Sequence, residues 1–86
     1  MHVVVRGRVQ GVGFRYFIAT RARALGLTGA VRNLPTGQVD ITAEGPVPAL
    51  EALVGAARSG PPGSRVRDLQ VNWEDAPARE MEFVIH

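Results

Sequence analysis

The chain has 86 residues, no cysteine and a formal net charge of +2, the size of one small domain that buries about 60% of its unfolded surface. The lack of cysteine excludes disulfides, thiolate nucleophiles and cysteine-bound metals. Arg6 interrupts the apolar N-terminal residues, and no apolar run approaches the length of a membrane span. We therefore expect a single cytoplasmic domain over residues 1–86.

Charge is divided unevenly along the chain. Residues 1–39 contain six arginines and no acid, whereas residues 40–86 contain four arginines and eight acids. The first half therefore suits an anionic ligand. The alternative is that these arginines are solvated or pair with acids of the second half. That reading applies most to Arg21 and Arg23, which can lie on the outer face of a helix.

The N-terminal residues predict a strand, a glycine loop and a helix in direct succession. Apolar and polar residues alternate over residues 2–9, which predicts a strand with one buried face. Gly11 and Gly13 then interrupt the pattern, and a helix is expected from residue 14 to its stop at Gly26. The apolar positions at helical spacing are Phe14, Phe17, Ile18, Ala22 and Leu25.

The rest of the chain predicts a second helix and four more strands. A strand over residues 28–34 leads through a turn at 35–37 into a strand over 38–44. Gly45-Pro46 opens a helix, and Gly60-Pro61-Pro62-Gly63 ends it. The apolar positions that mark the last two strands are Leu69, Val71 and Trp73, then, beyond Pro77, Met81, Phe83 and Ile85.

This order of elements is the ferredoxin-like split βαβ arrangement, an α+β sandwich. We expect two helices on one face of a four- to five-stranded antiparallel sheet. Right-handed crossovers give the strand order 4-1-3-2, and they leave open which side the fifth strand takes. The first and second strands then end at the same edge of the sheet. The glycine loop and Asn33 would therefore lie roughly 10 Å apart.

The glycine loop has the composition of an anion-binding site. Gly11 and Gly13 allow successive N–H groups to point at one anion, and the following helix adds the positive end of its dipole. Arg15, in the first helical turn, would close over the anion as a two-pronged donor. A cation at a helix N-terminus is unfavourable unless an anion lies between them, and such exceptions concentrate at functional sites. The loop matches neither a Walker loop nor a dinucleotide fingerprint.

Three segments together resemble the acylphosphatases, small enzymes that hydrolyse carboxyl-phosphate anhydrides. They are Gly7-Arg8-Val9-Gln10-Gly11-Val12-Gly13-Phe14-Arg15, Gly29-Ala30-Val31-Arg32-Asn33 and Gly37-Gln38-Val39. The resemblance covers nearly the whole chain. Two positions depart from it, because Ala30 stands where the family often has tryptophan, and Thr36-Gly37 replaces a frequent Asp-Gly turn.

The resemblance implies hydrolysis of acyl phosphates to a carboxylate and inorganic phosphate. It implies Arg15 and Asn33 as catalytic residues, with Asn33 orienting the attacking water. The predicted phosphate-binding residues are Gln10, Gly11, Val12, Gly13, Phe14 and Arg15. An asparagine before a turn can also simply bond its neighbouring backbone, and the motif match favours the functional reading.

The residues near the loop include no paired carboxylates, no serine with a histidine and no metal-binding cluster. An acyl phosphate needs none of these, because its carboxylate leaving group has a pKa near about 4 and departs without a general acid. Catalysis can then consist of positioning and charge stabilisation. We expect no metal and no cofactor, with His2 and His86 as solvated surface residues.

Two non-enzymatic functions share parts of this pattern. RNA-recognition domains have the same topology, but they need stacking aromatics on the central strands, where this chain has aliphatic residues. A phosphate-sensing domain would keep Arg15 but would not need Asn33. We expect a monomer that takes a small acyl phosphate, releases inorganic phosphate, and binds neither nucleic acid nor membrane.

Overall fold

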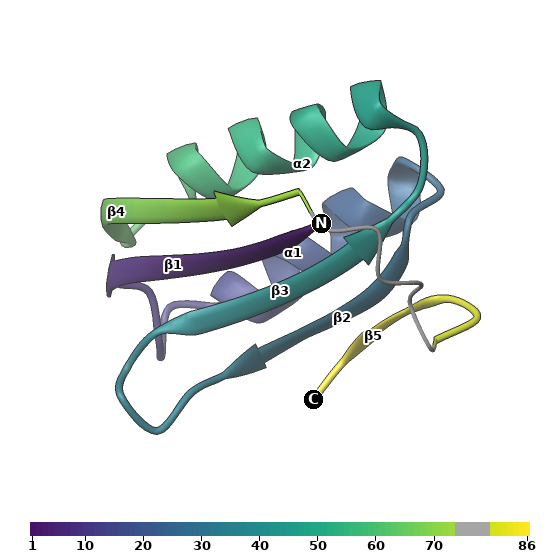
Figure 1. Cartoon of the computed structure of the whole chain (residues 1–86). Coiled ribbons are helices and arrows are strands. Elements are labelled where there is room, and N and C mark those ends of the chain that lie inside the picture. The colour runs from purple at the N-terminus through teal and green to yellow at the C-terminus, as the bar shows by residue number, and fades with distance from the viewer. Residues whose placement is uncertain (74–79) are drawn as a thin grey trace.

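A computed structural model describes residues 1–73 and 80–86 of the chain. Its elements are β1 (His2–Arg8), α1 (Phe14–Ala24), β2 (Thr28–Asn33), β3 (Val39–Glu44), α2 (Val47–Ser59), β4 (Arg65–Asn72) and β5 (Phe83–Ile85). The strands form one sheet in the order β4-β1-β3-β2-β5, with both helices on one face (Figure 1). The predicted ferredoxin-like arrangement and the order 4-1-3-2 are confirmed, and the fifth strand lies beside β2.

The sheet is mixed, so the expectation of a wholly antiparallel sheet is wrong at one edge. β3 pairs antiparallel with both β1 and β2, and β4 pairs antiparallel with β1. β5 runs parallel to β2, with Gly29 opposite Phe83 and Val31 opposite Ile85. The chain reverses direction between β4 and β5, and β2 already runs opposite to β4. A strand that reverses after β4 must therefore be parallel to β2.

The last two strands are shorter than the apolar pattern predicts. β4 ends at Asn72, and the next residue, Trp73, is 52% exposed. β5 begins at Phe83, and Met81 is 97% exposed outside it. Pro77, which the sequence places before the fifth strand, lies outside the described residues. The prediction from apolar alternation therefore made both strands longer than the segments that pair in the sheet.

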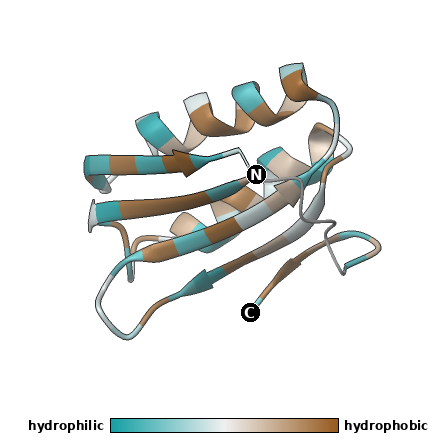
Figure 2. Ribbon diagram, viewed as in Figure 1, coloured by the Kyte–Doolittle hydropathy of each residue, from teal (hydrophilic) through white to brown (hydrophobic). Residues whose placement is uncertain are grey.

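The core lies between the sheet and the two helices. Phe14 and Phe83 are almost completely buried, and Phe17 packs against the core from a partly buried position. The inward positions of β3 are also buried, as their alternation predicts: Val39, Ile41 and Ala43. Figure 2 shows hydrophobic and hydrophilic residues alternating along β3 and β4. α1 packs against β2 and β5, and α2 packs against α1 and β4.

Gly29 allows β2 to approach β3 closely at the centre of this sandwich. Its φ is 141°, and a Cβ atom there would collide with the main-chain oxygen of Thr42. The contact is with backbone, which cannot move aside as a flexible side chain can. The glycine is therefore required for the pairing of the strand that ends at Asn33.

Two arginines of the first half, Arg6 and Arg32, pair with acids of the second half. Arg6 lies 3.2 Å from Asp68, and Arg32 lies 3.3 Å from Asp40. His2 contacts the same Asp40 carboxylate from β1. Arg6 and Arg32 therefore pair with acids, as the alternative to anion binding predicts. Their ion pairs are partly exposed and contribute little to stability. No helix among the described residues is long and apolar enough to cross a bilayer.

Candidate active site

The loop between β1 and α1 has the backbone conformation of an anion cradle. Gly11 and Gly13 have φ angles of 73° and 77°, while the intervening Val12 is not in the positive-φ region. Such an alternation of positive and negative φ is typical of nests, in which successive N–H groups turn toward a common point. Open space surrounds both glycines, since a Cβ atom at either would have no neighbour within 4 Å. Glycine is thus needed for the φ angle and not for room.

The start of α1 adds further unpaired donors to the same loop. The first helical hydrogen bond runs from the Phe17 N–H to the Gly13 carbonyl, at 3.0 Å. The N–H groups of residues 14, 15 and 16 precede it and have no acceptor within the helix. Gly13 provides no side-chain cap, and the first turn contains no acid. The positive end of the helix dipole is therefore available to an anion.

A cleft of about 210 Å³ opens over this loop. Its lining residues come from the loop, α1, β2 and β5: Val9, Gly11, Gly13, Phe14, Arg15, Tyr16, Asn33 and Ile85. The volume is smaller than the ~300–1,000 Å³ of pockets for drug-sized ligands. The structure thus brings the two residues predicted to be catalytic, Arg15 and Asn33, into one cleft suited to a small molecule.

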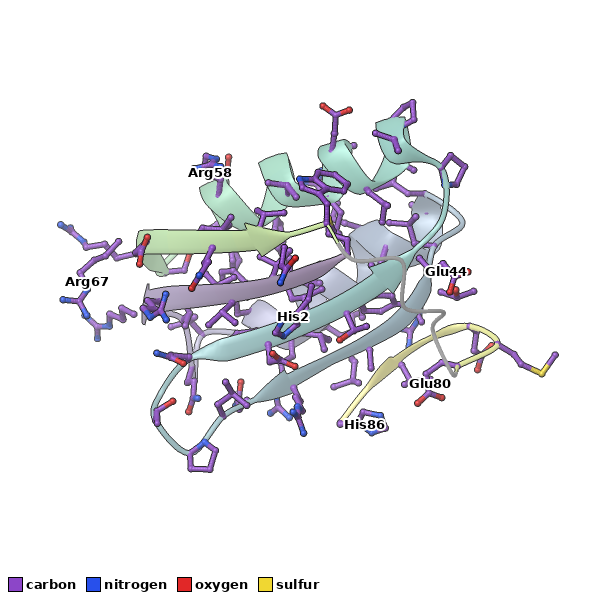
Figure 3. All side chains as sticks on the ribbon, in the orientation of Figure 1. His2, Glu44, Arg58, Arg67, Glu80 and His86 are labelled. Atoms are coloured by element: carbon purple, nitrogen blue, oxygen red, sulfur yellow. The ribbon has the colours of Figure 1, made fainter. Side chains whose placement is uncertain are left out.

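Arg15 is partly buried and is held by the residue that follows β5. Its Nη1 donates a 2.8 Å hydrogen bond to the main-chain oxygen of His86. His86 is in turn fixed by a 2.9 Å bond from its N–H to the Val31 carbonyl. The imidazole of His86 lies 3.4 Å from the carboxylate of Glu80, and Figure 3 shows these side chains together beside β5. The guanidinium retains several N–H donors that could bind phosphoryl oxygens.

Asn33 ends β2 and presents an unsatisfied oxygen. Its Oδ1 is buried and has no hydrogen-bond partner among the described residues. A buried polar atom without a partner costs about 1–3 kcal/mol, so such atoms usually mark a site for water, an ion or a reaction. The Asn33 oxygen therefore does not bond the neighbouring backbone, which was the alternative to a functional role.

Gln10 and Val12 are the predicted phosphate-binding residues that do not line the cleft. The side-chain nitrogen of Gln10 donates to the carbonyls of Leu34 and Gln38, at 2.8 and 2.9 Å. An amide has two N–H hydrogens, so both are used in this bridge to the β2–β3 turn. Val12 packs its side chain against the core. Phe14 lines the cleft but is 1% exposed, which leaves its main-chain N–H as its only polar contribution.

The arginines expected on the outer face of α1 have specific contacts. The Arg21 guanidinium carbon lies 5.0 Å from the centroid of the Phe17 ring. Arg23 Nε donates a 3.0 Å hydrogen bond to the Phe83 carbonyl and so ties α1 to β5. Among residues 1–73 and 80–86, no group of three or more His, Asp or Glu side chains is placed to hold a metal ion.

The sequence did not identify three lining residues of this cleft, Val9, Tyr16 and Ile85, nor the His86 oxygen that holds Arg15. Tyr16 could have been anticipated, because it follows Arg15 in the first turn of the helix. Ile85 of β5 and the His86 oxygen after it could not, since the apolar pattern does not say which edge of the sheet that strand joins. The position of β5 thus decides how the cleft is closed.

Together the fold and the cleft define a small ferredoxin-like α+β domain with a glycine loop and a small cleft at the end of its sheet. A protein-family model described as Acylphosphatase matches residues 1–85. The acylphosphatase of Thermococcus kodakarensis is 48% identical over 79 residues, which cover 92% of this chain and 87% of that protein. That of Methylococcus capsulatus is 46% identical over 85 residues, which cover 99% and 92%.

A solved structure shows the same relationship in three dimensions. The crystal structure of acylphosphatase from Bacillus subtilis has a TM-score of 0.94 and 42% identity to this chain, covering 99% of it and 94% of the other chain. The chain belongs to the acylphosphatase family. It is therefore an enzyme whose activity is the hydrolysis of acyl phosphates.

Proposed function

We propose that the enzyme holds the phosphoryl group with the main-chain N–H groups of residues 11–15 and the Arg15 guanidinium, while Asn33 positions the attacking water. The observation that carries this proposal is the unpartnered Asn33 Oδ1, buried in the same cleft as Arg15 and the uncapped helix end. An amide oxygen accepts a hydrogen bond from water and so can fix its orientation. The donors, the cation and the water site then surround one small anion.

The chemistry requires no other protein group. The water oxygen attacks phosphorus, and the bond between phosphorus and the bridging oxygen breaks, with its electron pair leaving on the carboxylate. A carboxylate with a pKa near about 4 is a good leaving group, so no general acid is needed. The proton of the water passes to a phosphoryl oxygen. Main-chain donors and Arg15 stabilise the charge on the equatorial oxygens throughout, as in other phosphoryl transfers.

Gln10 takes a supporting part in this proposal. Its two hydrogen bonds connect the start of the loop to the turn that follows Asn33. They fix the distance between the phosphate cradle and the residue that positions water. Rigid spacing matters because misplacement by about 1 Å can cost a hundredfold in rate.

Turnover of acetyl phosphate by wild type and three variants tests the mechanism. Arg15→Gln should lower kcat/KM by at least about a hundredfold, because it removes a preorganised charged donor. Asn33→Ala should lower kcat steeply and leave KM close to that of the parent, because water positioning acts in the transition state. Arg58→Gln, at the exposed end of α2 and away from the cleft lining, is the matched control.

Three results would contradict the assignment. Arg15→Gln turnover within a few-fold of the parent would remove the guanidinium from the mechanism. Loss of phosphate affinity in Asn33→Ala, with kcat retained, would make Asn33 an anion ligand. A chain that binds phosphate but never turns over would be the phosphate-sensing domain that needs Arg15 alone.

We also propose that the enzyme acts as a cytoplasmic monomer on small-molecule substrates, without metal, nucleic acid or membrane. The size of the cleft supports a small substrate, and β1 and β3 carry no Phe, Tyr or Trp on which a nucleic-acid base could stack. Light scattering at several protein concentrations tests the monomer. Fractionation of the source cells tests the location.

A further inference from the structure

The cleft has a polar end and an apolar rim. The polar end consists of the glycine loop, Arg15 and Asn33. Of the apolar lining residues, Val9 and Phe14 are each 1% exposed and belong to the core beneath the cleft. Tyr16 and Ile85 are different, because they are 70% and 38% exposed. They are the only large apolar side chains that both line the cleft and reach solvent, among the residues that the structure describes.

Both rim residues are next to Arg15 or its partner in the chain. Tyr16 follows it in α1, and Ile85 precedes His86, whose main-chain oxygen accepts the Arg15 hydrogen bond. A phosphoryl group held by Arg15 and the loop is enclosed by main chain and core on its inner side. The acyl group that it carries must therefore leave the cradle past the rim.

The Tyr16 side chain has no structural task among the described residues. The hydrogen bond between Thr20 and Tyr16 uses the main-chain oxygen of Tyr16, not its ring or hydroxyl. A large aromatic side chain that is mostly exposed, yet lines a cleft, is available to contact a ligand. Flat aromatic faces pack best against other flat or apolar groups.

We propose that Tyr16, together with Ile85, forms the acyl-binding wall of the cleft, so that Tyr16 is a specificity-determining residue. This inference rests on the proposed function. The enzyme then distinguishes substrates by their acyl group, and it favours acyl phosphates with a flat apolar acyl group over those with a methyl group. The phosphoryl group makes the same contacts in every substrate, and contacts of the acyl group with the rim produce the difference in kcat/KM between substrates.

The test compares benzoyl phosphate with acetyl phosphate. In Tyr16→Ala, the ratio of kcat/KM for benzoyl over acetyl phosphate should fall about two- to tenfold, the effect expected for loss of one aromatic contact. Ile85→Ala should lower the ratio by less. Tyr16→Phe should keep it, because the ring remains. Trp73→Ala, which removes an aromatic that is 52% exposed and outside the cleft lining, should leave the ratio unchanged.

A binding measurement separates this inference from the proposed reaction. Benzoylphosphonate and acetylphosphonate have a phosphorus–carbon bond and are not cleaved as acyl phosphates are. Their dissociation constants, measured by competition with inorganic phosphate, should differ in the parent and converge in Tyr16→Ala. An unchanged ratio in Tyr16→Ala, in turnover and in binding alike, would overturn the acyl-binding wall. Failure of the parent to hydrolyse either acyl phosphate, while the phosphonates still differ, would overturn the reaction alone.

Discussion

Gly13→Ala and Gly26→Ala form a matched pair that separates the stability of α1 from the geometry of the phosphate loop. Gly13 precedes the helix with φ 77°, and Gly26 follows it with φ 72°. At neither position would an added Cβ atom meet a neighbour within 4 Å. Both substitutions therefore impose the same conformational strain without a collision. They differ in that only Gly13 lines the cleft.

The cost to stability follows from this strain. An L-residue in the left-handed region is less stable by about 1–2 kcal/mol than in its preferred conformation. For a domain of this size each kcal/mol lowers Tm by about 4–8 °C. We expect both variants to lose similar free energies of unfolding within this range. Equilibrium denaturation in urea measures the loss.

Activity should separate the two variants. An alanine at position 13 can relieve its strain by moving to negative φ, which turns the loop N–H groups away from the phosphate. A displacement of about 1 Å at a reacting group costs around a hundredfold. We expect Gly13→Ala to lose about that factor in kcat/KM and Gly26→Ala to remain close to the parent. Acetyl phosphate hydrolysis, measured well below both melting temperatures, provides the comparison.

Two outcomes would refute this reasoning. If Gly13→Ala is destabilised but fully active, catalysis does not depend on the left-handed conformation of the loop. If Gly26→Ala loses as much activity as Gly13→Ala, the loss reflects a general weakening of α1 and not the cradle.

Three further results are expected. Inorganic phosphate at a hundred times its Kd should raise the free energy of unfolding by about 2.7 kcal/mol and therefore raise Tm in a thermal melt. A rise in Tm that persists in Arg15→Ala would place the bound phosphate elsewhere. Activity that EDTA abolishes and a divalent ion restores would contradict the metal-free mechanism. Gly29→Ala should lower the free energy of unfolding by more than about 2 kcal/mol, because its Cβ atom would collide with the Thr42 backbone. If urea denaturation gives a loss no larger than that of Gly13→Ala, β2 and β3 can move apart to accommodate the methyl group. Gln10→Ala should lower the free energy of unfolding by about 1–3 kcal/mol, because it removes two hydrogen bonds to main-chain carbonyls. It should also lower kcat. An unchanged kcat in a destabilised variant would limit Gln10 to a structural role.

The sequence predicted the strand order because alternation, helical spacing and the right-handed crossover rule each act locally or between neighbouring elements. Asn33 and the glycine loop could be placed at one sheet edge on that basis, and the structure brings them into one cleft. The side-chain role of Gln10 was not predictable, because its acceptors are carbonyls 24 and 28 residues away. Nothing in local propensity encodes such a contact.

The C-terminal strand marks the limit of sequence reasoning here. Its apolar pattern showed that a strand exists, but the pairing partner and direction depend on which sheet edge remains open after β4 has joined β1. Met81 fits the alternation and is nevertheless 97% exposed, because the pairing with β2 begins only at Phe83. The same pairing brings Phe83 within reach of Arg23 and brings the His86 N–H to the Val31 carbonyl.

The placement of β5 also determines when, during folding, the enzyme becomes competent. Arg15 and Asn33 both lie in the first 33 residues, but Ile85 ends a three-residue strand at the sheet edge, and the His86 oxygen follows directly after it. Short edge strands with few buried contacts open before the rest of a sheet does. Opening of β5 would free the Arg15 side chain while β1, β2, β3 and β4 stay paired. We therefore expect the cleft to be lost before the pairing of the other four strands as the protein unfolds. Loss of turnover should therefore precede loss of secondary structure as denaturant is added.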